Sequence, residues 1–317
     1  MRFVTFLSNP SSTSWHEGRP GLLVADGEAV VDLHDAAAAL AAEPPPPEPT
    51  HLHWFDLEGP WFAFAERVAR AVARDPDAGR RLGDNHAWHA SSEVRLLAPV
   101  PRPGKIIAIG LNYRDHAAEA RMPVPESPVV FAKFPTAVVG PGMPIVLPAA
   151  SRRVDYEAEL AVVVGRRVRG IARGDALGAV FGFTNANDVS ERDFQKADGQ
   201  WVRAKSCDTF APLGPAVVTL DELADPHALR IELRLNGETM QASNTGQFVF
   251  DVPSLVAFVA DTITLEPGDV ILTGTPPGVG FARRPPVFLH PGDRVEVEIE
   301  GLGVLRNPVI AAPSTTP

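Results

Sequence analysis

Cysteine is nearly absent from this sequence, and positive charge is in the minority. The only cysteine is Cys207, so no disulfide forms within the chain, and a reducing compartment, the cytoplasm, is expected. Lysine and arginine number 29 against 39 aspartates and glutamates, which gives a formal net charge of −10. No basic stripe with interleaved aromatic residues is present, so a nucleic-acid partner is not expected.

Long apolar runs are missing as well. No stretch approaches the roughly 18 to 20 apolar residues of a membrane-spanning helix, so no membrane association is expected. The opening segment, MRFVTFLSNPSS, lacks the apolar core of a signal peptide and reads as an edge strand that runs into a turn. The glycine-rich segments match neither the P-loop nor the Rossmann fingerprint, and we expect no organic cofactor.

The pattern of elements changes near residue 100. Before it lie a hairpin signal at Asp26–Gly27, a Pro-rich connector at 44–49 and helical spacing over 60–82. We therefore predict a small N-terminal α+β domain over residues 1–100.

Residues 101–317 form the second predicted domain, which contains mostly strands. Many short β-rich runs are separated by turn signals, and helical periods occur only at 112–120, 190–197 and 253–262. Because strands and helices do not alternate as in βαβ units, the pattern favours a strand-dominated α+β fold with a mixed or antiparallel sheet.

Three carboxylates interrupt an otherwise apolar strand pattern, VDYEAELAVVVG at 154–165. Alternate residues of a strand share a face, so Asp155, Glu157 and Glu159 are expected on one side. Burying like charges without a partner costs several kcal/mol each, and a bound cation would offset that cost. Oxygen ligands suit Mg²⁺, Mn²⁺ or Ca²⁺ over zinc. The alternative is a solvent-facing strand edge.

A second polar segment, FGFTNANDVSERDFQ, ends an apolar run. Asp188 falls at a strand-to-helix turn, and a capping pattern begins at Ser190. Arg192 and Gln195 lie three residues apart and share a helix face, and Lys205 follows in WVRAKSCDTF. The alternatives are that Asp188 is a turn former and that the two basic residues are solvated charges.

Further candidates flank these segments. His116 and Glu119 lie three residues apart on one helical face in GLNYRDHAAEA, where the carboxylate can orient the imidazole, or the pair is an incidental surface contact. Lys133 stands among apolar residues in VVFAKF and needs an anionic partner. In LTGTPPGVG at 272–280, backbone N–H groups and the Thr275 hydroxyl can bind a carboxylate.

Taken together, these segments resemble the fumarylacetoacetate hydrolase family. The resemblance covers about residues 105–310 and rests on GLNYRDHAAEA, FAKF, DYEAELAVVVG, NDVSERDFQ, AKSCDTFAPLGP and LTGTPPGVG, in the family's order. It implies a mixed β-sandwich roll with a small N-terminal domain, a homodimer, and bound Mg²⁺ or Mn²⁺.

The resemblance also implies a role for each matched position. The metal ligands would be Glu157, Glu159 and Asp188. A lid dyad that activates water would be His116 and Glu119. Groups that steady the developing oxyanion would be Arg192, Gln195 and Lys205. Residues that bind the substrate would be Lys133, Thr275 and Tyr113. Asp155 is not a family ligand, and we expect it to pair with Arg152 or Arg153.

The resemblance implies an enzyme that hydrolyses a carbon–carbon bond. The substrate would be a 2,4-dioxo acid, such as an acylpyruvate, a fumarylacetoacetate-like acid or a diketo-deoxy sugar acid. Its cleavage would release a pyruvate enolate stabilised by the metal. The same site serves two alternatives: decarboxylation of oxaloacetate, and isomerisation or hydration of 2-hydroxy-dienoates. A third alternative is a non-catalytic metal- or ligand-binding protein.

Overall fold

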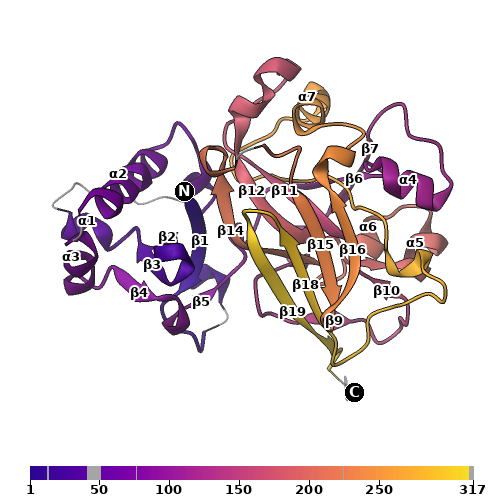
Figure 1. The fold of residues 1–317 in the computed structure, drawn as a ribbon, viewed down its shortest axis with the longest axis horizontal. Helices are drawn as coiled ribbons and strands as arrows, with labels where there is room; N and C mark the ends of the chain where they lie inside the picture. The colour runs from indigo at the N-terminus through magenta and orange to yellow at the C-terminus, as the bar shows by residue number, and fades with distance from the viewer. Residues whose placement is uncertain (13, 41–50, 76, 224, 314–317) are drawn as a thin grey trace.

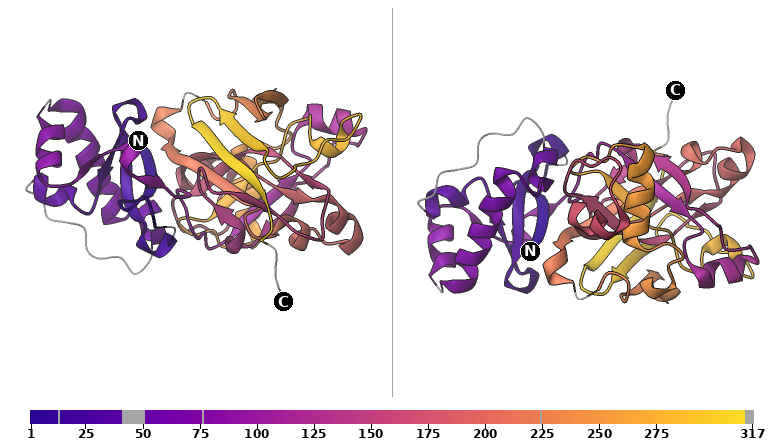
Figure 2. Two further views of the ribbon diagram at one scale, coloured as in Figure 1. Left: turned by 90° about the horizontal axis from the view of Figure 1, so that it is seen from below. Right: turned by 90° about the horizontal axis from the view of Figure 1, so that it is seen from above.

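The molecule consists of a smaller N-terminal body and a larger C-terminal body, which lie side by side (Figure 1). The structure is a computed structural model that describes residues 1–12, 14–40, 51–75, 77–223 and 225–313. Two further views show the same side-by-side arrangement (Figure 2). The Pro-rich connector predicted at 44–49 lies outside the described residues. No helix in the described ranges is long and apolar enough to cross a bilayer.

The N-terminal body contains short strands and three helices. Its strands are β1 (Arg2–Leu7), β2 (Arg19–Val24), β3 (Ala29–Asp32), β4 (Trp88–Ala90) and β5 (Arg95–Leu96). Its helices are α1 (Ala36–Ala39), α2 (Pro60–Arg74) and α3 (Ala78–Asp84). β2 and β3 form the hairpin predicted at Asp26–Gly27. The helical spacing over 60–82 is divided between α2 and α3, because Asp75 precedes a proline and adopts an extended conformation.

The main sheet runs through both bodies. Its order is β4-β3-β2-β1-β14-β12-β11-β17-β6-β7. The strands from the C-terminal body are β6 (Ile106–Gly110), β7 (Val129–Lys133), β11 (Ala158–Val164), β12 (Val180–Asn187), β14 (Ala211–Thr219) and β17 (Val270–Leu272). β8 (Val138–Val139) also pairs with β14. Most pairs are antiparallel, but β17 and β6 run parallel, so the sheet is mixed.

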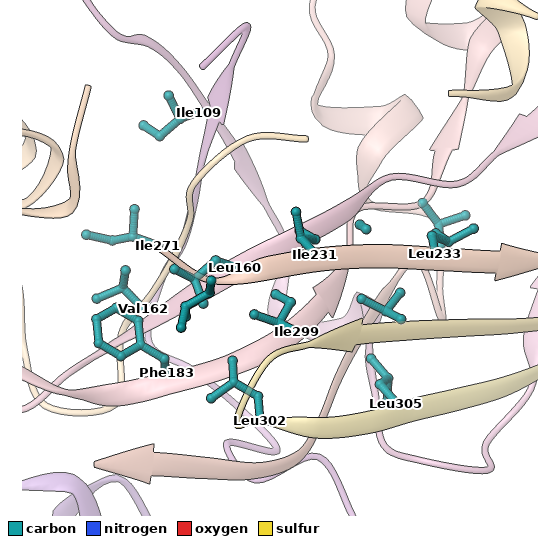
Figure 3. Close-up of a cluster of buried hydrophobic side chains, with 14 of the residues drawn as sticks. Ile109, Leu160, Val162, Phe183, Ile231, Leu233, Ile271, Ile299, Leu302 and Leu305 are labelled. Carbon is teal, nitrogen blue, oxygen red and sulfur yellow. The ribbon is translucent and has the colours of Figure 1, made fainter. Parts of the chain in front are cut away.

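A second sheet packs against the first. Its order is β16-β15-β18-β19-β9. Its strands are β9 (Ile145–Leu147), β15 (Arg230–Leu235), β16 (Glu238–Asn244), β18 (Arg294–Ile299) and β19 (Gly303–Ala311). The apolar side chains between the sheets include Leu160, Val162, Phe183, Ile231, Leu233 and Ile299 (Figure 3). The opposite face of β11 packs in the other large core, through Ala161 and Val163. Because both faces are covered, β11 is apolar almost throughout.

Short elements complete the end of the molecule that lies away from the N-terminal body (Figure 1). β10 (Val154–Asp155) pairs with β13 (Ser190–Glu191) in a two-stranded sheet. The helices at this end are α4 (Arg114–Ala120), α5 (Arg192–Asp198) and α6 (Val202–Lys205), whereas α7 (Val252–Thr262) lies nearer the middle of the molecule (Figure 1). α4, α5 and α7 fall on the three predicted helical periods. The strand-dominated α+β fold predicted from the sequence is confirmed.

Two local predictions are wrong. β1 is not an edge strand, because it pairs with β2 on one side and with β14 on the other. The strand predicted over 154–165 is two strands, β10 and β11, which pair with different partners. The linking residues Tyr156 and Glu157 belong to neither strand, so the carboxylates along this segment do not share one regular strand face.

The two bodies share packing as well as a sheet. The ring of Phe3 lies 4.8 Å from that of Phe181, and the ring of Phe55 lies 5.2 Å from that of Phe181. Arg2 and Phe3 of β1 pair in register with Val218 and Val217 of β14. The division of the chain into domains 1–100 and 101–317 stays a prediction.

Candidate metal centre and active site

Three buried carboxylates converge where β10, β11 and β12 meet. Glu157, Glu159 and Asp188 each offer an oxygen within 4.8 Å of the other two. The pairing of β11 with β12 places them there, because Ala158 is opposite Asn187 and Asp188 directly follows β12. The Asp188 backbone N–H donates to the Glu157 carbonyl at 2.8 Å, and the Asn187 side chain accepts from the Glu157 N–H at 3.0 Å. These two bonds hold the backbone of Glu157 against the end of β12, where Asp188 lies.

Three buried cations surround this triad. The Lys133 ammonium donates to Oδ1 of Asp188 at 2.6 Å. The Lys205 ammonium donates to Oδ2 of Asp188 and to Oε2 of Glu157, both at 2.6 Å. The Arg192 guanidinium donates to Oε1 of Glu157 at 2.6 Å. Buried charges of opposite sign in direct contact offset much of each other's desolvation cost.

Glu157 and Glu159 of the triad ionise very differently. Burial opposes ionisation of Glu157, but Lys205 and Arg192 outweigh it and lower its pKa to about 2. Burial, together with Asp188 and Glu157, raises the pKa of Glu159 well above its ordinary value. Glu159 accepts a hydrogen bond from the Gly274 N–H at 2.7 Å, and none of the three cations donates to it. Of the three carboxyls, Glu159 therefore has the greatest unmet need for a positive charge.

The two lysines also differ. Burial outweighs Asp188 at Lys133 and lowers the pKa of its ammonium group. Burial is likewise the largest single influence at Lys205, but Asp188 and Glu157 together exceed it and raise the pKa. The difference follows from the contacts, since Lys205 touches two carboxylates of the triad and Lys133 touches one.

Asp155 pairs with Arg192, so the expected pairing with Arg152 or Arg153 is wrong. The guanidinium Nε donates to Oδ2 of Asp155 at 2.9 Å. Arg153 pairs with Asp193 instead, at 3.1 Å. Asp155 is completely buried on β10, and that short strand directs its side chain toward α5. It thus orients a cation that in turn contacts a triad carboxylate.

Backbone N–H groups of the glycine-rich segment 272–280 bind the protein's own carboxylates. The Gly274 N–H donates to Glu159, and the Gly278 N–H donates to Glu119 at 3.0 Å. The Gly280 N–H donates to Asp155 at 2.7 Å. A Cβ at position 280 would lie 1.9 Å from a backbone oxygen, so glycine is required there. The backbone N–H groups of this segment thus bind carboxylates, and these carboxylates belong to the chain itself.

The predicted dyad forms on α4. His116 Nδ1 lies 3.2 Å from Oε2 of Glu119, and both groups are partly shielded from solvent. Asp115 accepts a hydrogen bond from the Ser243 hydroxyl, and the Arg114 guanidinium donates to the Phe248 carbonyl. These contacts fix α4 to β16 and to the segment that follows it. With Nδ1 engaged, Nε2 is the ring nitrogen left for proton transfer.

The remaining predicted residues occupy varied positions. Gln195 accepts from the Arg192 guanidinium at 2.9 Å, so both belong to the carboxylate surroundings. Lys133 also lies there and is completely buried, although the resemblance implied substrate contact. The Thr275 hydroxyl accepts from Gln241 at 2.9 Å. The Tyr113 hydroxyl is buried without a partner among the described residues, and burial beside Glu159 and Asp115 raises its pKa.

The helix cap predicted at Ser190 is wrong. Glu191 is the N-cap of α5, because its side chain accepts from the Phe194 N–H. The Ser190 hydroxyl donates instead to the Asp188 carbonyl at 2.9 Å. The cap therefore belongs to the residue that directly precedes α5, and Ser190 helps fix the turn that carries Asp188.

Sequence reasoning missed Gln241, which joins several parts of the site. Its side-chain oxygen accepts from the Ala158 N–H at 2.9 Å, and its amide donates to Thr275 and to the Pro276 carbonyl. It lies on β16, far along the chain from β11. A polar residue in an alternating strand gives no signal of this role. Its inward position becomes evident only when the two sheets pack.

The donor set fits a hard divalent cation. The triad supplies only carboxylate oxygens, which are preferred ligands of Mg²⁺, Mn²⁺ and Ca²⁺. Glu159 carries the observation that decides the fit, since burial beside two carboxylates without a contacting cation disfavours its charged form. A cation among these oxygens would reverse that preference. In the described ranges, no other group of His, Cys, Asp or Glu side chains has such an arrangement.

Comparison with known proteins identifies the family. Residues 105–310 match the family model described as fumarylacetoacetate (FAA) hydrolase C-terminal. This chain belongs to the fumarylacetoacetate hydrolase family. The family match covers every triad and dyad residue, and the chain is an enzyme of this family with an acidic site suited to a divalent metal.

Members of the fumarylacetoacetate hydrolase family with different names resemble this chain. Oxaloacetate tautomerase FAHD2A, mitochondrial, of Bos taurus is 55% identical over 221 residues, which cover 69% of this chain and 70% of that protein. Oxaloacetate tautomerase fahd2, mitochondrial, of Xenopus laevis is 44% identical over 312 residues, 98% of this chain and 90% of that protein.

A solved structure resembles the whole chain. Maleylpyruvate hydrolase from Sphingobium sp. SYK-6, in complex with manganese(II) and pyruvate, is 31% identical with a TM-score of 0.75. The alignment covers 99% of this chain and all of that one. The predicted fumarylacetoacetate hydrolase fold with an N-terminal region is thereby confirmed.

Proposed function

We propose that this enzyme interconverts the keto and enol forms of a small 2-oxo diacid, with oxaloacetate as the first candidate. The observation that carries the proposal is the 55% identity to an oxaloacetate tautomerase, together with an intact triad and dyad in this chain. This proposal departs from carbon–carbon hydrolysis and is closest to the isomerase alternative. A cleaved bond is not needed, because moving one proton between carbon and oxygen completes the reaction.

The chain supplies a proton-transfer group in the pair of His116 and Glu119. Glu119 holds His116 by Nδ1, so that Nε2 can take a proton from one substrate atom and return it to another. Glu119 is itself held by the Gly278 N–H, which limits rotation of the pair. The anchors from α4 to the second sheet keep the imidazole in place during the transfer.

The cations supply charge complementarity for an acid. Lys205 and Arg192 each direct hydrogen-bond donors toward Glu157, and Gln195 steadies the guanidinium. A divalent ion held by Glu157, Glu159 and Asp188 would add positive charge for the substrate's carboxylate and 2-oxo oxygens. Several points stay predictions. They are the homodimer, the substrate contacts made by Lys133, Thr275 and Tyr113, and the identity of the ion as Mg²⁺ or Mn²⁺.

Hydrolysis of an acylpyruvate is the second candidate. The likeness to maleylpyruvate hydrolase favours it, because that structure holds manganese and pyruvate on a fold that aligns with 99% of this chain. The same His116 and Glu119 pair would then take a proton from water. Hydrolysis adds water to a carbonyl and breaks a carbon–carbon bond, whereas tautomerisation only moves a proton. Both need a group that transfers a proton, so the dyad alone does not separate them.

The test uses the full chain with Mg²⁺ or Mn²⁺ added, and two substrates. Enol oxaloacetate is followed by ultraviolet absorbance and an acylpyruvate by release of pyruvate. We expect rapid loss of the enol signal without loss of carbon, and on the order of 10² to 10⁴ lower activity in His116→Ala. Pyruvate release from the acylpyruvate, without acceleration of tautomerisation, would overturn the proposal in favour of hydrolysis.

A further inference from the structure

Two buried lysines contact the triad in different ways. The Lys133 ammonium donates to Oδ1 of Asp188 and to the Val189 carbonyl at 3.2 Å, so it touches one carboxylate of the triad. The Lys205 ammonium lies 2.6 Å from Oε2 of Glu157 and 2.6 Å from Oδ2 of Asp188. Among the described residues, Lys205 is the one cation that bridges two members of the triad.

The triad oxygens are already engaged. Both oxygens of Glu157 and both oxygens of Asp188 accept a bond from a lysine or an arginine. Glu159 uses Oε2 for the Gly274 N–H, which leaves Oε1 as the triad oxygen that accepts no hydrogen bond from the described residues. An ion that binds all three carboxylates must therefore share oxygens with at least one of these cations.

A divalent ion and the Lys205 ammonium would bind oxygens of the same two carboxylates, Glu157 and Asp188. Magnesium and manganese bind oxygen at roughly 2.0 to 2.2 Å, closer than an ammonium group does. Two positive charges held by one pair of buried oxygens repel each other strongly, since little water screens them. Lys133 is less affected, because its contact is with the other oxygen of Asp188.

We propose that Lys205 is an internal competitor of the divalent ion. Its ammonium group links Glu157 to Asp188, and binding of the ion releases it from at least one of the two, while Lys133 keeps its contact with Asp188. The ring of Phe131 lies 5.0 Å from the Lys205 ammonium and provides an aromatic face for the released charge. Lys205 thus sets how tightly the site holds its ion.

This inference rests on the metal site named under the proposed function, and Mn²⁺ affinity tests it directly. EDTA-treated wild type, Lys205→Met and Lys133→Met are titrated with Mn²⁺ in a calorimeter. Methionine keeps an apolar chain of similar length and removes the charge. Lys133→Met is the matched control, because both lysines are buried and both contact Asp188.

We expect Lys205→Met to bind Mn²⁺ at least tenfold more tightly than wild type, and more tightly than Lys133→Met. An affinity in Lys205→Met equal to or weaker than either would overturn the inference. Wild type that binds no Mn²⁺ would remove the metal site itself and the inference with it. Wild type that binds Mn²⁺ but turns over no oxaloacetate would remove the proposed reaction and leave this test intact.

Crystal structures of wild type with EDTA and with Mn²⁺ keep the inference testable if Lys205→Met does not fold. We expect the Lys205 ammonium to lie beyond hydrogen-bond distance of Glu157 or Asp188 when Mn²⁺ is bound. The contact of Lys133 with Asp188 should be the same in both structures. Both Lys205 contacts preserved beside a bound Mn²⁺ would contradict competition.

Discussion

Two groups of acidic and basic residues in this molecule differ in their exposure to solvent. The central charged cluster consists of Asp155, Glu157, Glu159, Asp188, Lys133, Arg192 and Lys205. The outer ion-pair network on the second sheet consists of Glu232, Glu296, Glu298, Arg234 and Arg306. Every member of the central cluster except Arg192 is buried, and the Arg192 side chain is 9% exposed. In the outer network Arg234, Arg306 and Glu298 are 21%, 57% and 45% exposed.

The difference lies in how fully each group satisfies its charges. Arg234 contacts Glu232, Glu296 and Glu298 at 2.7 to 3.1 Å, and Arg306 adds a further contact with Glu296. The central cluster keeps Glu159 without a contacting cation at a site where water cannot compensate. A fold retains such an arrangement at a functional site, whereas the outer network is explained by surface pairing alone.

Of the variants that test this difference, Asp188→Asn should cause the largest loss of unfolding free energy. The change leaves the two buried lysines facing a neutral amide, and breaking a buried pair costs about 3 to 5 kcal/mol of unfolding free energy. Urea unfolding of EDTA-treated protein measures this cost. Asp193→Asn is the matched control, because its pair with Arg153 is half exposed and should contribute about 1 kcal/mol or less. Equal losses in the two variants would contradict the contrast.

Acid should weaken the central cluster through Glu157. Its pKa is lowered to about 2 in the folded protein from an ordinary 4.5, because Lys205 and Arg192 outweigh the effect of burial. Such a carboxyl stabilises the fold above its unfolded pKa, and this stability is lost as the pH falls through the folded value. Unfolding free energy measured between pH 5 and about 2 should fall less steeply in Glu157→Gln, which cannot titrate. Identical slopes in the two proteins would count against the assignment.

Asp155→Asn tests whether Asp155 acts by orienting Arg192, since Asp155 is not one of the three carboxylates proposed to bind the metal ion. The amide keeps the shape but loses one acceptor, so Arg192 and the loop amides of Gly280 and Phe281 compete for the remaining oxygen. We expect activity to fall about 10- to 100-fold, as is typical when a group that orients a metal ligand is removed. The measurement is kcat and KM for oxaloacetate. Wild-type values for both would show that Asp155 has no positioning role.

Arg234→Met should have the smallest effect, because it tests the exposed side of the comparison. Arg234 and two of its three partners, Glu232 and Glu298, are accessible to solvent, which screens their charges, so the expected loss is about 1 kcal/mol or less of unfolding free energy. Activity should be unchanged, and added salt should reduce the difference from wild type. Stability measured at low and high salt checks both points. A loss as large as that of Asp188→Asn would remove the distinction between the two groups.

Composition and strand periodicity predict the fold class, and motif order predicts the family. Glu157 and Glu159 meet in one site as predicted, although Glu157 lies between β10 and β11 and not on one regular strand with Glu159, and the turn after FGFTNAN adds Asp188. Spacing three residues apart correctly pairs His116 with Glu119. These successes share a cause, since each depends on contacts within one element or between neighbouring strands.

The failures concern contacts between distant segments. Asp155 was expected to pair with the nearest arginines, but β10 pairs with β13 and so brings Arg192 of α5 within reach. The role of Gln241 depends on how two sheets stack, which no local pattern encodes. The position of β1 inside the main sheet depends on its pairing with β14, more than 200 residues further along the chain.

Titration with Mn²⁺ of wild type and Glu159→Gln tests the central claim most directly. Glutamine keeps the shape of Glu159 and an acceptor for the Gly274 N–H, but it removes the carboxyl that no cation in the cluster contacts. We expect one Mn²⁺ per chain in wild type and at least tenfold weaker binding in the variant, with both proteins folded. Equal Mn²⁺ affinity in the two proteins would contradict the account of the triad as a metal centre.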